Sequence, residues 1–157
     1  MRNEKLLIIV CAFILGVLVT VFVQGSESRY AFSEDAVPTE SPSDHINDED
    51  LFVFKDRALI EKDNLIWARV KDTHSMEPVL NADSVSLELK PQDTSFINKG
   101  DIISFRQGSK VIIHRVVLTG QDKLGWFCVT KGDNNKEPDP YKVRFDDVKG
   151  VVVGILY

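Results

Sequence analysis

Residues 111–117 of the chain, VIIHRVV, give the clearest indication of the fold. Five of these seven side chains are β-branched, which favours a strand. Alternation places Ile112, His114 and Val116 on one face of that strand and the residues between them on the other. The stretch therefore predicts a β-strand with a partly buried histidine on an apolar face.

Similar short apolar runs, rich in Val, Ile, Phe and Trp, recur on both sides of this stretch. Gly, Asn, Asp and Lys separate them, and none keeps a helical period. We expect strands over residues 51–54, 58–61, 65–70, 85–89, 101–105, 111–118, 126–130 and 149–156. Eight short strands in one stretch predict a compact all-β domain over residues 51–157, either a barrel or a folded-over sheet.

Residues 6–23 contain no charged side chain. This apolar run is long enough for a membrane-spanning helix. We therefore expect residues 1–24 to form an N-terminal transmembrane anchor. A cleaved secretory signal is the alternative, although the apolar run is long for one. Arg2 and Lys5 precede the run, which favours an N-terminus inside the cell. The rest of a single-pass membrane protein would then lie on the extracytoplasmic side.

Residues 25–50 are rich in Ser, Glu, Asp and Pro, and residues 26–50 hold eight acidic side chains against one basic. Such a segment predicts a flexible acidic linker, with His45 exposed to solvent. The linker accounts for the net charge of −5, because residues 51–157 hold sixteen basic and fifteen acidic side chains. A nearly neutral domain lacks the basic patch that nucleic-acid binding needs, so we expect no nucleic-acid partner.

The chemistry-bearing side chains are few. Cys11 and Cys128 are too far apart in the expected organisation to form a disulfide, and no Cys-x-x-Cys metal motif occurs. Residues 72–78 (DTHSMEP) form a polar turn between two expected strands, and they include Ser75. A serine in a turn is ordinarily a solvated or capping residue. As a nucleophile it would need a base, and His114 could supply an imidazole, the side chain most often used as a general base.

An imidazole in that role needs a third group, usually a carboxylate, to hold its tautomer. Asp133 and Asp139 follow the expected strand at residues 126–130, and both are candidates. Gly-Asp-Asn-Asn and Pro-Asp-Pro are also ordinary turn sequences, so the residues alone leave a purely structural role open for either aspartate.

Four motifs stand in one order along the chain: residues 75–78 (SMEP), 99–105 (KGDIISF), 113–117 (IHRVV) and 130–135 (TKGDNN), with Asp139 after the last. Together they resemble the signal peptidase I family. More narrowly, they are similar to its archaeal and endoplasmic-reticulum-type branch, also found in some Gram-positive bacteria, in which histidine replaces the lysine base. The resemblance covers about residues 65–157. It implies an all-β signal peptidase/LexA-like domain.

The resemblance implies a catalytic role for Ser75 as the acylating serine and for His114 as the general base. Asp133 and Asp139 match the two aspartates of the last motif, and the family's greater need for the later one favours Asp139 as the residue that orients His114. Asp133 would hold the turn or support the site through hydrogen bonds. Asp101 matches a position that we interpret as structural.

Thr73-His74-Ser75 stands where the family commonly has Ser-Gly-Ser. The resemblance implies an oxyanion hole made by the Ser75 backbone N–H and the Thr73 hydroxyl. His74 replaces the usual glycine. As an alternative base it is disfavoured, because adjacent residues of an extended chain point in opposite directions.

The function implied is that of a membrane-anchored serine endopeptidase that removes signal peptides from secretory preproteins. The preprotein would bind as an added β-strand, with accessory subunits as further candidate partners and with no metal or organic cofactor. Two alternatives stay open. One is a non-catalytic, membrane-tethered β-domain that binds a partner. The other is a LexA-like self-cleaving peptidase with a serine-lysine dyad, disfavoured by the apolar segment and by His114.

Overall fold

The computed structural model describes residues 40–71 and 73–157. The predicted transmembrane anchor at residues 1–24 and the first part of the predicted linker lie outside them. Among the described residues, no helix is both long and apolar enough to cross a membrane. The described residues belong to one compact unit.

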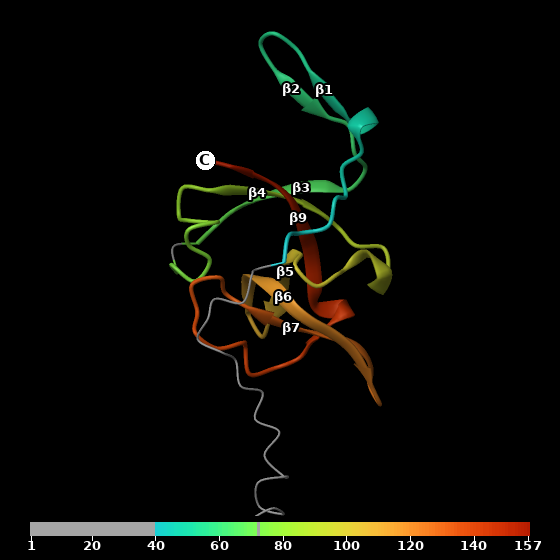
Figure 1. Ribbon diagram of the computed structural model, residues 1–157, viewed down its shortest axis with the longest axis vertical. Coiled ribbons are helices and arrows are strands. Elements are labelled where there is room, and N and C mark those ends of the chain that lie inside the picture. The colour runs from blue at the N-terminus through green and yellow to red at the C-terminus, as the bar shows by residue number, and fades with distance from the viewer. Residues whose placement is uncertain (1–39, 72) are drawn as a thin grey trace, which may run out of the picture. The chain divides into compact units, whose positions relative to one another are not determined.

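This part of the chain is built from antiparallel strands and short 3-10 turns, without an α-helix, so the prediction of a mainly β fold is confirmed (Figure 1). The strands are β1 (Leu51–Val53), β2 (Ala58–Ile60), β3 (Leu65–Arg69), β4 (Val85–Leu89), β5 (Ile102–Gln107), β6 (Lys110–Asp122), β7 (Gly125–Lys131), β8 (Val143–Arg144) and β9 (Val148–Leu156). The 3-10 turns are η1 (Asp48–Asp50), η2 (Thr94–Phe96) and η3 (Phe145–Asp147).

Within the described residues, β1 and β2 form a separate hairpin, and the other strands form one sheet in the order β3-β4-β9-β5-β6-β7-β8. Every pairing is antiparallel. The final strand, β9, lies between β4 and β5 and thereby joins the β3–β4 hairpin to the β5–β8 meander. Register shifts occur on both sides of β9, at Leu87/Glu88 and at Ser104/Phe105, and such irregularities bend a sheet.

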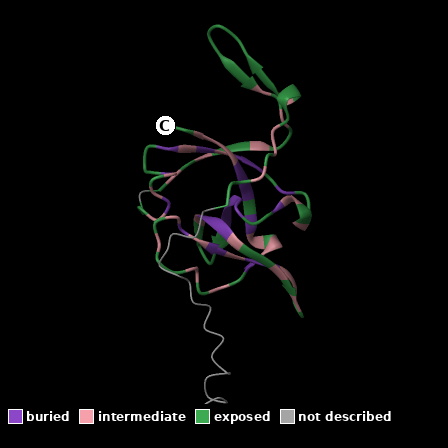
Figure 2. Cartoon of the chain, in the orientation of Figure 1, coloured by how far each residue is buried: buried purple, intermediate pink, exposed green. Residues whose placement is uncertain are grey.

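Apolar side chains pack on both faces of this sheet. One cluster contains Ile103, Phe105, Val116 and Cys128, and the other contains Met76, Leu80, Ile102 and Val152. Figure 2 shows that the buried residues gather along the central strands, whereas the β1–β2 hairpin is exposed. Burial raises the pKa of the Cys128 thiol to about 12, so this cysteine stays protonated. Met76 lies one residue after Ser75, so its burial anchors the serine loop to the core.

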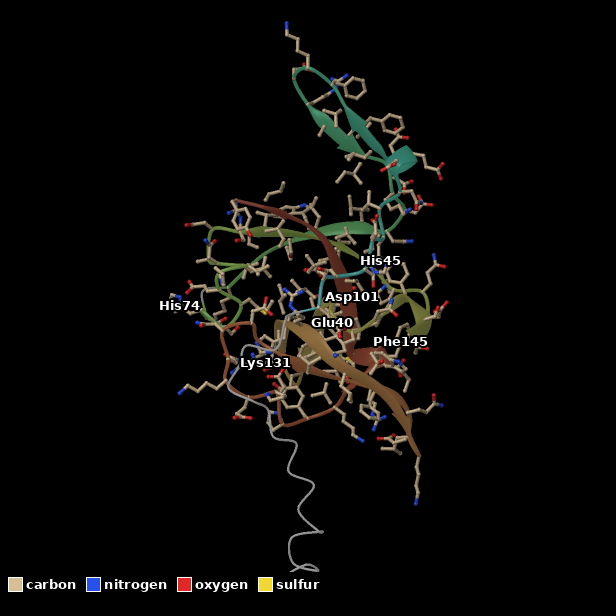
Figure 3. All side chains as sticks on the ribbon, in the orientation of Figure 1. Glu40, His45, His74, Asp101, Lys131 and Phe145 are labelled. Atoms are coloured by element: carbon tan, nitrogen blue, oxygen red, sulfur yellow. The ribbon has the colours of Figure 1, made fainter. Side chains whose placement is uncertain are left out.

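Residues 40–50 form the last part of the predicted linker, and the structure describes them. This segment contacts the domain: the Ser43 backbone N–H donates to Asp101 Oδ1 at 2.6 Å, and Lys99 Nζ lies 2.7 Å from Glu40 Oε1. His45 stacks on Phe96 with ring centroids 4.2 Å apart, and its Nε2 lies 3.5 Å from Asp101 Oδ2 (Figure 3). The prediction of a solvent-exposed His45 is therefore wrong.

The reason for this difference is a pairing that local composition does not reveal. The partner of the Ser43 N–H is 58 residues away in sequence. Asp101 is fully buried and also accepts from the Asn98 backbone N–H at 2.8 Å, as a residue that holds a turn would do. Its contacts agree with the structural role expected for it, and they extend that role to the docking of residues 43–45.

Candidate active site

His114 lies on β6 opposite Ile103 of β5. Its face of the strand packs into the core cluster that contains Val116, and the Phe105 ring meets the imidazole edge-on at 6.5 Å between ring centroids. The side chain of His114 is 9% exposed. The alternation of the VIIHRVV stretch thus placed the histidine correctly on a buried apolar face. Both ring nitrogens nevertheless have polar neighbours.

Ser75 lies in the loop between β3 and β4, and the fold brings it to His114 although 39 residues separate the two in sequence. The distance from Ser75 Oγ to His114 Nε2 is 3.2 Å. On the other side of the ring, His114 Nδ1 lies 2.7 Å from Asp139 Oδ2. The three side chains form one hydrogen-bonded series, hydroxyl to imidazole to carboxylate.

Asp139 is held from a second direction. The buried Thr130 hydroxyl donates to Asp139 Oδ2 at 2.6 Å, and the Asp139 backbone N–H donates to the Thr130 carbonyl at 2.7 Å. The carboxylate therefore has a fixed position, which in turn fixes the imidazole. The charge of Asp139 also acts on Tyr141: burial, and to a lesser extent this carboxylate, raises the pKa of the Tyr141 phenol.

Asp133 lies elsewhere. Its two carboxylate oxygens accept from Arg115 Nε at 2.8 Å and Arg115 Nη2 at 2.7 Å, and Arg115 Nη1 donates to the Gly100 carbonyl at 2.8 Å. Both members of this bidentate pair are about nine-tenths buried. Of the two sequence candidates, Asp139 is thus the aspartate that contacts His114, and Asp133 is a structural partner of the residue next to it.

The turn that carries Asp133 packs directly on the serine loop. The Asn134 backbone N–H donates to the Ser75 carbonyl at 2.9 Å, and Asn134 Nδ2 donates to the His74 carbonyl at 3.0 Å. A Cβ atom on Gly132 would lie only 2.5 Å from the Ser75 carbonyl oxygen. Glycine at position 132 is therefore what allows the two backbones to approach so closely.

Thr73, the second predicted contributor to an oxyanion hole, has its Oγ1 atom 3.1 Å from Ser75 Oγ. Within residues 40–71 and 73–157, the Ser75 backbone N–H donates no hydrogen bond. The Thr73 hydroxyl and the Ser75 N–H, the two groups expected to form the oxyanion hole, therefore lie beside the serine hydroxyl. The N–H is available to an incoming oxygen atom.

His74 adopts the left-handed conformation, with φ of 55°, which glycine adopts most readily. This agrees with the glycine that the family resemblance places here. The His74 side chain, labelled in Figure 3, is 68% exposed. Its Nδ1 lies 2.8 Å from Glu77 Oε1. Ser75 Oγ contacts Thr73 Oγ1 at 3.1 Å and His114 Nε2 at 3.2 Å.

A groove of about 810 Å³ runs past Ser75 and His114. Apolar side chains form much of its lining, among them Ile66, Leu80 and Ile113. Among the described strands, β3 lies at the edge of the sheet and contributes to one wall, so its outer backbone groups are not used in sheet pairing. The groove is thus suited to an extended peptide.

No cluster of three His, Cys, Asp or Glu side chains that could hold a metal ion occurs in the part of the chain that the structure describes. The site that does occur there has the composition of the serine hydrolases, in which a carboxylate orients an imidazole that activates a hydroxyl for acyl transfer.

The chain is distantly homologous to signal peptidase I W of Bacillus subtilis (strain 168), with 33% identity over 81 residues. The aligned part covers 51% of this chain and 43% of the Bacillus protein, so the chain spans less than half the length of this relative. No family model matches the chain. No solved structure matches it either.

Sequence reasoning did not identify Arg115 and Thr130 as parts of the site. Arg115 had a readable signal, because an arginine within an apolar strand needs a buried acidic partner, and Asp133 was one of few candidates. Thr130 had no such signal. It is one of several hydroxyl residues near strand ends, and only the geometry links it to Asp139.

Proposed function

We propose that this chain is a membrane-anchored serine endopeptidase of the signal peptidase I type that cleaves signal peptides from secretory preproteins. The observation that carries the proposal is the series Ser75–His114–Asp139, with 3.2 and 2.7 Å between the interacting atoms. Distant homology to signal peptidase I W supports the choice of substrate class.

In the proposed reaction, Ser75 Oγ attacks the carbonyl carbon of the scissile peptide bond and His114 Nε2 accepts the hydroxyl proton. Asp139 stabilises the resulting imidazolium. The Ser75 N–H and the Thr73 hydroxyl stabilise the oxyanion, which then collapses and expels the amine, protonated by His114. A water molecule, deprotonated by His114, hydrolyses the acyl-enzyme and regenerates Ser75.

The substrate would lie in the groove as an extended segment and pair with the outer edge of β3. The apolar lining favours small or apolar side chains next to the scissile bond, which suits the end of a signal peptide. The predicted anchor at residues 1–24 would hold this groove at the extracytoplasmic membrane surface, where such cleavage sites emerge. Accessory subunits remain candidate partners.

The test uses the full chain in membranes, incubated with a panel of secretory preproteins and, separately, with a serine-directed acylating probe. We expect preprotein cleavage and a mass increase of one probe per chain, and neither result with Ser75→Ala. Cleavage by Ser75→Ala would refute the serine mechanism. Absence of both cleavage and labelling in the unmodified chain would favour the non-catalytic, partner-binding β-domain instead.

The predicted topology has its own test. Protease added to intact spheroplasts should digest residues 40–157, whereas a cytoplasmic control protein stays intact. Full protection of the domain would place it in the cytoplasm and would contradict the proposed access to secreted substrates.

A further inference from the structure

Four basic side chains line the groove that passes Ser75. Arg69 ends β3, Lys71 follows it on the way to the serine loop, Lys110 begins β6, and Lys149 belongs to β9. All four are exposed, and none forms an ion pair or a side-chain hydrogen bond within the described residues. They come from three separate parts of the sheet, and no acidic side chain of the described residues pairs with them.

Of the described residues that line the groove, Glu88 is the only acidic one. Its side chain is buried, and its two oxygens accept from the Ser86 hydroxyl at 2.7 Å and the Ser104 hydroxyl at 2.5 Å. Glu88 forms no ion pair with the basic residues of the groove. Among the described residues, the exposed lining of the groove therefore carries four basic side chains, and its one carboxylate is buried.

We infer that this groove selects extended peptides that carry acidic side chains beyond the small or apolar residues at the scissile bond. Charges of one sign along a cleft with poorly polarisable walls concentrate the field and raise the local concentration of oppositely charged ligands. Each exposed pair contributes little by itself, and salt weakens it. Four such charges together are enough for a selectivity of about tenfold between an acidic peptide and its uncharged equivalent.

This inference rests on the proposed function and narrows its substrate class. The test compares two peptides that share one cleavable sequence, with Asp and Glu beyond the residues at the scissile bond in one and Asn and Gln in the other. With the full chain in detergent at low salt, we expect kcat/KM about tenfold higher for the acidic peptide. We expect the difference to shrink at 0.5 M salt, where screening is strong.

The decisive variant replaces the four groove cations with glutamine (Arg69→Gln, Lys71→Gln, Lys110→Gln and Lys149→Gln). The matched control replaces one arginine and three lysines that are exposed outside the groove (Lys55→Gln, Arg57→Gln, Lys123→Gln and Lys136→Gln). Both variants lose the same net charge. The acidic preference should disappear in the groove variant and persist in the control.

Binding gives a readout that does not need turnover. Fluorescence anisotropy with the Ser75→Ala chain should show tighter binding of the acidic peptide, and the groove substitutions should abolish the difference. Equal binding of the two peptides, or an equal loss of preference in groove and control variants, would overturn the inference. Absence of cleavage of both peptides together with selective binding would refute the proposed function while leaving the acidic selectivity intact.

Discussion

Arg115 holds both carboxylate oxygens of Asp133, at 2.8 and 2.7 Å, although it is the immediate neighbour of His114, which contacts Asp139 instead. His114 and Arg115, which lie on opposite faces of β6, thus contact the two aspartates of one loop. One pair belongs to the candidate proton-transfer series, and the other fastens the loop to the strand. The two aspartates should therefore respond differently to substitution.

Asp139→Asn should remove the negative charge that favours the imidazolium and lower kcat by about 10³–10⁴-fold, with little change in thermal stability. Asp133→Asn should instead change kcat little and lower the stability of the fold. It leaves the buried guanidinium of Arg115 without its charged partner, and we expect it to lower the free energy of unfolding by about 2–4 kcal/mol. Preprotein cleavage and urea unfolding measured on both variants check this division.

The control is a double-mutant cycle between Arg115→Gln and Asp133→Asn. If the pair acts as described, the double variant should be more stable than the sum of the two single losses implies. A stable but inactive Asp133→Asn, together with an active Asp139→Asn, would assign the orienting role to Asp133.

Ser75→Ala and His114→Ala should each lower preprotein cleavage by at least about 10³-fold, and the double variant should be hardly worse than either. The reason is that hydroxyl and imidazole act on one proton, so the loss of one partner makes the other ineffective. Single-turnover cleavage assays on the three variants provide the measurement. Additive losses would show that the two residues contribute independently.

His74→Gly should retain cleavage within about threefold of the unmodified chain. The substitution removes a side chain that is mostly exposed and relieves the left-handed strain at φ of 55°, although glycine also gains freedom in the unfolded state. His74→Ala, which keeps a Cβ atom in the same conformation, is the matched control. Loss of cleavage in both variants, with activity preserved in His114→Ala, would identify His74 as the base.

Asp122 should give the hairpin β6–β7 a pH-dependent stability. Its hydrogen bonds to Arg144 and Lys142 hold the pKa of its carboxyl well below the usual value of 3.8. A carboxyl with a depressed pKa in the folded state stabilises above its unfolded pKa, and this contribution is lost as the pH falls towards the folded value. Asp122→Asn should therefore lower Tm at pH 7, and the difference from the unmodified chain should shrink below about pH 4.

Asp146→Asn provides the reference for this experiment, because Asp146 is an exposed carboxylate with no ion pair among the described residues. Its Tm should follow that of the unmodified chain at every pH. A Tm difference for Asp122→Asn that stays constant between pH 7 and pH 3 would argue against the ion pair as its source.

Local sequence patterns predicted most of the sheet, because apolar β-branched runs set strand positions regardless of what pairs with them. These patterns did not predict the strand residues that depend on pairing with a neighbouring strand and have no apolar alternation of their own. β6 continues through the polar residues 119–122 because β7 pairs with them, and β8 is only Val143–Arg144, too short to show any alternation. The contacts of His45 with Phe96 and Asp101 depend on partners far along the chain, and no local pattern encodes them.

The position of β9 also sets the time at which the candidate site can form. Ser75 belongs to the β3–β4 side of the sheet, and His114 belongs to the β5–β8 side. The strand between them, Val148–Leu156, is the last of these elements to leave the ribosome. A nascent chain that has reached only residue 147 already contains Ser75, His114 and Asp139, but it lacks the strand that unites their two halves. We therefore expect the candidate site to form only after β9 has been synthesised.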